Sequence, residues 1–260
     1  MTHLPQRHGC ACVVPFFNER ERILSVLDVV TTIPHLAQVI CVDDGSTDGT
    51  AALVARRFPQ VSMLLLTNNS GKAAAVQAAT DMVQASHVLL LDADLRGLAA
   101  IEIERAVVAA LANPEIDMII LRRIKAAVPA RLSRGDVLFS GERIVKTAEL
   151  AAALAANPSR YQIEIALNRI MLEQGKRVYW MPSSARNTLK VQKHGPMRGL
   201  AGDVAMVKNM IDYAGVGAYL EQYLHFAREE ARLAYETKTV EGAETLEGLA
   251  TTSVDWRQLS

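Results

Sequence analysis

The chain has 260 residues, of which half are hydrophobic and 22% are charged, and this is an ordinary globular composition. Lys plus Arg and Asp plus Glu both number 28, so the formal net charge is zero and no global field attracts nucleic acid. No apolar run reaches the roughly 18 residues that suggest a membrane span, and the N-terminus lacks the apolar core of a signal peptide. We therefore expect a cytoplasmic protein, and contact with a membrane surface stays open.

The first half of the chain alternates short apolar runs with segments of helical spacing. Strands are predicted at 10–14, 39–42, 61–66, 87–91 and 116–121, and helices at 19–30, 51–57, 72–84 and 101–111. The strands are continuous apolar runs, which is typical of strands covered by helices on both faces. This order predicts an α/β fold with a mostly parallel central sheet.

The second half follows a different pattern. The segment from Arg122 to Asp136 carries five basic residues with Pro129 and Gly135, and it is predicted to be a long loop of the kind that closes over ligands. Helices are predicted at 140–154 and 163–173, a short strand at 177–181 and a mostly helical segment at 197–235. We expect a single domain over 1–235 and a polar, loosely held tail over 236–260.

Polar motifs follow three of the predicted strands, at the edge of a parallel sheet where ligands bind. The first strand leads into 15–19 (Pro-Phe-Phe-Asn-Glu), the second into 43–50 (Asp-Asp-Gly-Ser-Thr-Asp-Gly-Thr) and the fourth into 92–94 (Asp-Ala-Asp). A further motif, 69–72 (Asn-Ser-Gly-Lys), opens a helix. These four motifs are the candidate binding residues.

Asp92 and Asp94 offer hard oxygen ligands for Mg²⁺ or Mn²⁺, which proteins hold with one or two carboxylates plus substrate phosphates. Aspartates at a strand end also stabilise turns, so a structural role is the alternative. Asp44 has the same alternative, or it accepts hydrogen bonds from a nucleobase or ribose. Lys72 at a helix start opposes the helix dipole, which indicates an anionic ligand nearby, with a solvated lysine as an equal alternative.

In this order the four motifs resemble the nucleotide-binding half of family 2 glycosyltransferases, over residues 10 to 95. The resemblance extends to 140–143 (Ser-Gly-Glu-Arg) and 161–168 (Tyr-Gln-Ile-Glu-Ile-Ala-Leu-Asn), which are similar to the acceptor half of soluble or peripheral members. It implies the GT-A fold, with a nucleotide-binding half at about 10–121, an acceptor half at about 122–235 and a helical C-terminal segment.

The resemblance also implies a role for individual residues around a nucleotide-sugar. The nucleotide would be contacted by Pro15, Phe16, Asn18, Glu19, Asp44, Lys72, Asp92 and Ala93. Of these, Asp44 would hold the base and Lys72 would lie beside base or ribose. Asp92 would contact ribose or metal, and Asp94 would bind the metal and take part in catalysis.

The acceptor half departs from the family pattern. Many members have a Glu-Asp pair whose Asp is the general base, and a later Gln-x-x-Arg-Trp, and this chain has neither. Glu164 is the substitute candidate for the base, with an ordinary helix-surface glutamate as the alternative. His194 or Asn187 is the candidate third metal ligand, with a solvated loop side chain as the alternative for each.

The expected function is metal-dependent transfer of a sugar from a nucleotide-diphosphate sugar, with UDP favoured over GDP, by a displacement that inverts configuration. The acceptor is open between a polyprenyl phosphate, a small phosphorylated acid and a glycan, and a homodimer is compatible with the sequence. One rival is a sugar-phosphate nucleotidyltransferase, whose Gly-rich signature with Arg is replaced here by 15–18. The other is a non-catalytic nucleotide-sugar-binding protein or partner subunit.

Overall fold

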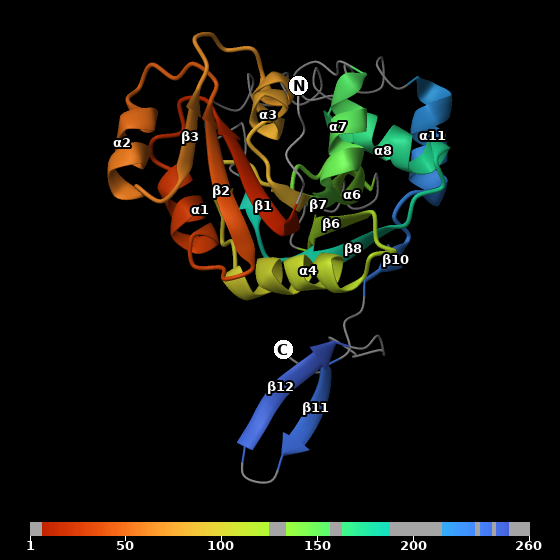
Figure 1. Cartoon of the computed structure of the whole chain (residues 1–260). Helices are drawn as coiled ribbons and strands as arrows, with labels where there is room; N and C mark the ends of the chain where they lie inside the picture. The colour runs from red at the N-terminus through yellow and green to blue at the C-terminus, as the bar shows by residue number, and fades with distance from the viewer. Residues whose placement is uncertain are drawn as a thin grey trace.

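A computed structural model describes residues 7–124, 134–156, 163–187, 215–231, 235–240 and 243–249. At its centre lies an eight-stranded sheet in the order β10-β8-β6-β7-β4-β1-β2-β3 (Figure 1). The strands are β1 (Arg7–Phe16), β2 (Leu36–Asp43), β3 (Ser62–Leu65), β4 (Ala85–Leu90), β6 (Met118–Arg123), β7 (Arg143–Lys146), β8 (Val178–Ser183) and β10 (Glu229–Glu230). Every neighbouring pair is parallel except the two that β7 makes, so the predicted mostly parallel sheet is confirmed.

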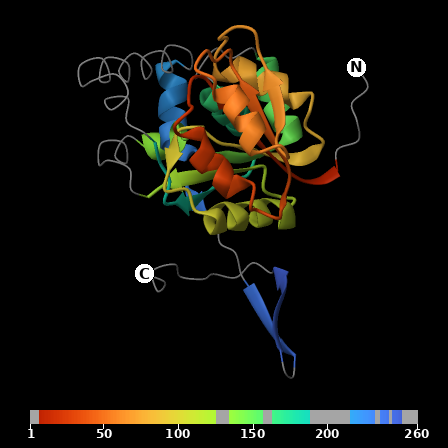
Figure 2. The same cartoon turned by 90° about the vertical axis from the view of Figure 1, so that its left-hand side faces the viewer.

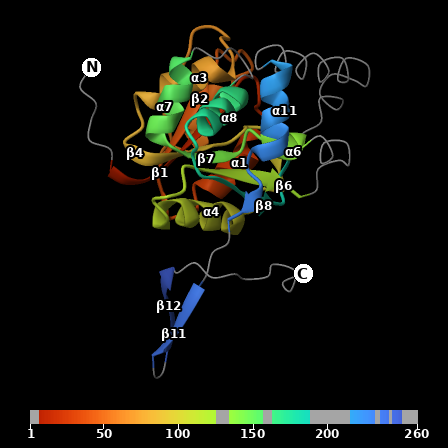
Figure 3. The same cartoon turned by 90° about the vertical axis from the view of Figure 1, so that its right-hand side faces the viewer.

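Helices cover both faces of this sheet (Figures 1 and 3). One core cluster includes buried residues of α1 (Ile23–Val30), α2 (Thr50–Arg57) and α4 (Ala100–Ala112). The other includes residues of α3 (Lys72–Thr80), α6 (Gly135–Leu138), α7 (Thr147–Ala155) and α8 (Ile163–Glu173). Successive side chains of a strand point to opposite faces. In β1, Cys10, Cys12 and Val14 therefore join the first cluster while Ala11 and Val13 join the second.

Strand β7 corrects the helix predicted at 140–154. Residues 143–146 pair antiparallel with both β4 and β6, and the helix begins only at Thr147. The helix prediction was wrong at its start because the strand has only four residues and is followed directly by the helix, with no turn residue between them. The β-branched Ile144 and Val145 are fully buried between the two neighbouring strands, so tertiary pairing decides the conformation.

The C-terminal region also differs from its prediction. Helix α11 (Val216–His225) ends well before residue 235, and the chain then pairs with β8 through β10. Part of the predicted helical segment, 197–214, lies outside the described residues. Within the predicted polar tail, β11 (Tyr235–Val240) and β12 (Ala243–Leu249) form a separate antiparallel hairpin (Figures 1 and 2).

A short two-stranded sheet lies next to the last of the sequence motifs. Strand β5 (Leu95–Arg96) pairs antiparallel with β9 (Arg186–Asn187), and Leu95 lies opposite Asn187. The backbone of Asn187 is thereby held beside the residue that follows Asp94. In the described part of the chain, no helix has both the length and the apolar character needed to cross a membrane.

Candidate active site

The loops after β1 and β2 are joined by hydrogen bonds at the carboxyl edge of the sheet. The backbone N–H of Asn18 donates to Ser46 Oγ at 2.9 Å, and the backbone N–H of Thr47 donates to the side-chain Oδ1 of Asn18 at 2.9 Å. Asn18 adopts a φ of 54°, a conformation that asparagine tolerates better than most residues. The predicted nucleotide residues of 15–19 therefore lie against the second motif, with Pro15 and Phe16 buried and Glu19 paired to Arg22 at 2.6 Å.

Asp44 fixes the loop that starts helix α3. Its two carboxylate oxygens accept hydrogen bonds from the amides of Ser70 and Gly71, at 2.8 and 2.7 Å. The neighbouring Gly45 has a φ of 78°, and a Cβ there would lie 2.8 Å from the carbonyl carbon of Asn68. Asp44 thus has a structural role in placing Lys72, and its predicted contact with a nucleobase stays a prediction.

Lys72 joins two carboxylates that are far apart in the sequence. Its Nζ lies 2.6 Å from Asp92 Oδ1, after β4, and 2.7 Å from Glu164 Oε1, in the first turn of α8. The side chains of Lys72 and Glu164 are only 12% and 6% exposed, so neither is the solvated surface residue of the alternative interpretation. Burial disfavours the ammonium charge, but the two carboxylates outweigh it and raise the pKa of Lys72.

Gly141 closes one side of this arrangement. A Cβ at residue 141 would lie 2.5 Å from Lys72 Nζ and 2.7 Å from Asp92 Oδ2, closer than atoms can approach. The backbone just before β7 is therefore in contact with the ion pair. We call Lys72, Asp92, Gly141 and Glu164 the Lys72 cluster, and it brings four of the sequence motifs together.

Arg143 anchors the helix that carries Glu164, a role that was not predicted from the sequence. It is completely buried and donates to Asn168 Oδ1 at 2.5 Å and to the Glu164 carbonyl at 3.3 Å. Burial lowers the pKa of Arg143 to about 10, against the opposing effect of Glu164 and Glu142. Its position two residues after Gly141, within the 140–143 motif, is the one sequence signal that pointed to it.

Glu142 is a second buried group for which the sequence predicts no role. Its Oε2 accepts a hydrogen bond from Ser140 Oγ at 2.9 Å and lies 3.8 Å from Arg123 Nε. Its Oε1 is buried without a hydrogen-bond partner. Burial raises the pKa of the Glu142 carboxyl and Asp92 adds to this, while Arg123 opposes it. The site therefore holds a third carboxylate next to the Lys72 cluster.

The residues after β4 fit a divalent cation that is shared with a ligand. Asp92 and Asp94 are partly exposed at the carboxyl edge and supply hard oxygens. The pKa of Arg22 is raised mainly by its hydrogen bond with Glu19 and also by the Asp94 carboxylate, which places that charge near the first motif. No three His, Cys, Asp or Glu side chains gather as a metal site within the described ranges, and His194 lies outside them.

The basic segment from Arg122 to Asp136 is described only at its ends. Arg122 Nε lies 2.5 Å from Asp136 Oδ2, and its guanidinium lies over the Trp180 ring at 4.9 Å. Arg123 Nε lies 3.8 Å from Glu142 Oε2. The ends of the segment are thus held together beside the Lys72 cluster, while its predicted closure over a ligand concerns residues 125–133, outside the described part.

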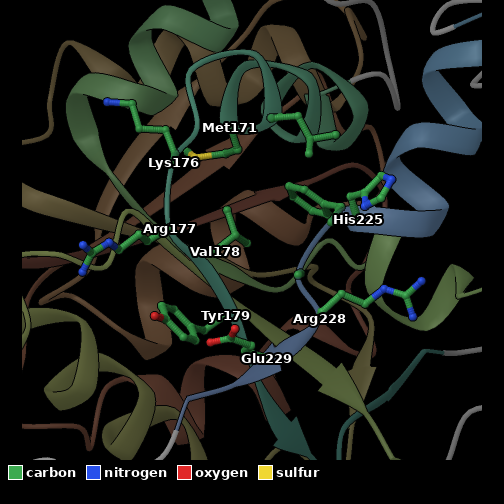
Figure 4. Close-up of a pocket in the computed structure, with 11 residues that line it drawn as sticks. Met171, Lys176, Arg177, Val178, Tyr179, His225, Arg228 and Glu229 are labelled. Carbon is green, nitrogen blue, oxygen red and sulfur yellow. The ribbon is translucent and has the colours of Figure 1, made fainter.

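A hollow of about 230 Å³ lies elsewhere, between the end of α8, the start of β8 and the residues after α11 (Figure 4). Figure 4 shows the charged ends of Lys176, Arg177 and Arg228 directed away from Met171 and Val178. Lys176 and Arg177 are paired with Glu149 and Glu115. None of the predicted site residues lines this hollow.

Curated relatives match about a third of the chain. One is the uncharacterized glycosyltransferase YaiP of Escherichia coli, 33% identical over 93 residues, which are 34% of this chain and 23% of that protein. Another is a dolichyl-phosphate beta-glucosyltransferase of Trichomonas vaginalis, 38% identical over 96 residues, which are 32% of this chain and 28% of that protein. The chain thus spans about a quarter of the length of these relatives.

Among solved structures, the fold matches glucosyl-3-phosphoglycerate synthase from Mycobacterium tuberculosis in complex with Mn²⁺, UDP and glucosyl-3-phosphoglycerate. The TM-score is 0.62 at 17% identity, and the match covers 92% of this chain and 87% of that chain. At this identity the match shows the shared GT-A fold. The family model of glycosyl transferase family 2 matches residues 11–134. All four nucleotide-side motifs lie in this range, so over its nucleotide side the chain is similar to glycosyl transferase family 2.

Proposed function

We propose that this protein is an enzyme that transfers a sugar from a UDP-sugar to an acceptor bearing a phosphate group. The observation that carries the proposal is the Lys72 cluster at the carboxyl edge of the sheet, next to Asp94. In α/β folds this edge is where ligands bind, and here it gathers a cation and several carboxylates from both halves of the chain. A GDP-sugar is the second candidate donor.

The nucleotide-side residues would hold the donor. The joined loops of 15–19 and 43–47 would contact base and ribose, with the loop at Ser70 and Gly71 kept in place by Asp44. Asp94, with Asp92, would hold Mg²⁺ or Mn²⁺ together with the diphosphate oxygens. A cation bound there supplies Lewis-acid stabilisation of the leaving diphosphate.

Glu164 is our candidate for the general base. Its Oε1 is engaged with Lys72, whereas Oε2 is buried without a hydrogen-bond partner and would take the proton of an acceptor hydroxyl that displaces its present neighbours. Arg143 would keep the carboxylate in place through the Glu164 carbonyl and Asn168. A single displacement assisted by this base inverts the configuration of the anomeric carbon.

The acceptor class is proposed from the charges at the ends of the basic segment and from the names of relatives. Arg123 is only loosely paired with Glu142, at 3.8 Å, and lies at the carboxyl end of β6. One relative is named for dolichyl phosphate, and another, from Rhizobium johnstonii, is a dodecaprenyl-phosphate galacturonate synthase, 34% identical over 92 residues. The solved synthase carries a phosphorylated glycerate product. A phosphomonoester is common to these acceptors.

Thermal melting tests the donor assignment. We expect UDP at millimolar concentration to raise the melting temperature, and MnCl₂ to enlarge that shift, because ligands that bind only the folded state stabilise it by mass action. GDP, measured in parallel, should give a smaller shift. If neither nucleotide moves the transition, the donor assignment is wrong. If UDP binds but no transfer to phosphorylated acceptors and no hydrolysis of UDP-sugars is measurable, the non-catalytic alternative is the better interpretation.

The absence of a side chain at residue 141 gives a second test. Gly141→Ala should displace the ends of Lys72 and Asp92, because the new Cβ takes their space. Since both ends are flexible, we expect a small change in melting temperature but a clear weakening of UDP binding in the presence of Mn²⁺. Gly217→Ala is a matched control at an open position of α11, where no atom lies within 4 Å of the added Cβ and the backbone is not left-handed. Unchanged UDP binding in Gly141→Ala would argue against a ligand at the cluster.

A further inference from the structure

The position of Lys72 creates a conflict with the cation that the proposed function requires. Asp92 is a proposed metal ligand, yet its Oδ1 already accepts a hydrogen bond from the Lys72 ammonium at 2.6 Å. The same ammonium neutralises Glu164 at 2.7 Å. The Asp92 side chain is 24% exposed and can still be reached from solvent. Lys72 thus acts as a counter-ion that belongs to the protein itself.

Steric contacts limit the ways in which this conflict can be relieved. The backbone at Gly141 lies against both Lys72 Nζ and Asp92, so the ammonium cannot retreat toward β7. On its other side it is held by Glu164 on α8. A divalent cation held by Asp92 would therefore be a neighbour of the ammonium, and the repulsion between the two is strong at the reduced dielectric of a partly buried site.

We propose that Lys72 keeps bare divalent cations off Asp92 and admits them only together with the diphosphate of the donor. The negative charge of the diphosphate offsets the repulsion between the ammonium and the metal, so metal and nucleotide bind as a unit. This inference rests on the proposed function and deepens it, because it assigns to a residue of the chain the order in which metal and donor bind.

The stability of a variant without this ammonium follows from the same charges. Without Lys72, Asp92 and Glu164 are two carboxylates in a mostly buried site that also contains Glu142, and unpaired buried charges are strongly destabilising. A divalent cation could then take over the role of the missing ammonium. The variant should become both less stable and more responsive to metal alone.

The experiment compares wild type, Lys72→Met and Lys146→Met without nucleotide. Lys146 forms a Lys–Asp pair of 2.7 Å with Asp117 outside the site, so its variant controls for the loss of such a pair. Mn²⁺ binding is measured by electron paramagnetic resonance, and melting temperature with and without MnCl₂. We expect Lys72→Met to bind Mn²⁺ at least tenfold more tightly than wild type, and to melt lower but recover with MnCl₂. Lys146→Met should bind Mn²⁺ as wild type does.

Two outcomes overturn the inference. One is equal Mn²⁺ affinity in wild type and Lys72→Met. The other is a wild-type protein that binds Mn²⁺ as tightly without UDP as with it. This measurement needs no variant, so it tests the inference even if Lys72→Met does not fold. Either result leaves the proposed function standing if UDP and Mn²⁺ still stabilise wild type, whereas a wild-type protein that responds to neither UDP nor GDP contradicts the proposed function itself.

Discussion

Replacing Asp94 with asparagine is expected to remove the metal-dependent part of UDP binding and to reduce sugar transfer by about 10³-fold or more. Asparagine keeps the size of the side chain but removes the charge that a hard divalent cation requires of its ligand. A metal that stabilises a leaving diphosphate supplies several kcal/mol in the transition state, and about 1.4 kcal/mol corresponds to each tenfold change in rate. Calorimetric titration of UDP with and without MnCl₂ measures the binding effect.

Asp28→Asn is the control, because Asp28 forms an exposed pair with Arg57 on the surface. It should titrate as wild type does. Asp94→Asn should also keep its melting temperature without ligands, since the carboxylate lies partly exposed at the edge of the sheet. A variant whose UDP affinity still rises with MnCl₂ as in wild type would exclude Asp94 as a metal ligand.

Glu164→Gln is expected to lower the transfer rate by ~10²–10⁴-fold, the usual contribution of a positioned general base. This is about 3–5 kcal/mol in the activation barrier. The amide oxygen can still accept the hydrogen bond of Lys72, so UDP binding should remain within a few-fold of wild type. Single-turnover transfer from a UDP-sugar to a phosphorylated acceptor measures the effect on the chemical step. UDP affinity, measured separately, gives the effect on nucleotide binding.

Glu149→Gln provides the matched comparison for Glu164. Glu149 pairs with Lys176 at 2.6 Å, away from the Lys72 cluster, so this variant removes a carboxylate from a similar Lys–Glu pair. It should transfer at the wild-type rate. Wild-type transfer by Glu164→Gln would instead restrict Glu164 to holding Lys72, and the base would have to be sought elsewhere.

The nucleotide side of the fold could be predicted from the sequence because its signals are local and repeat. The continuous apolar runs that become β1, β2 and β4 predict parallel strands, and parallel strands present their carboxyl ends at one edge. The motifs at Asn18, Asp44 and Asp92 therefore had to lie near one another. Helix α8, from Ile163 to Glu173, is also predicted with the observed bounds, because its apolar residues follow helical spacing.

The contacts of the acceptor side could not be predicted in this way. Glu164 lies beside the apolar stripe of its helix, and nothing local indicates that Lys72, 92 residues earlier, neutralises it. Arg143 and Glu142 are charged residues that are completely buried, against the usual preference of such residues for solvent. Their burial depends on partners from α6 and α8 and on Arg123. Only the assembled sheet supplies those partners.

The place of β7 has a consequence for how the chain acquires its structure. This strand lies between β4 and β6, so two strands of the nucleotide side are bridged by residues 143–146 from the other side. A fragment that stops at residue 134 would leave the facing edges of β4 and β6 without their partner, and such edges invite aggregation. The sheet can close only after the later segment has been synthesised, and pairing across this sequence separation slows folding. We therefore expect the two halves to unfold together, as one cooperative unit.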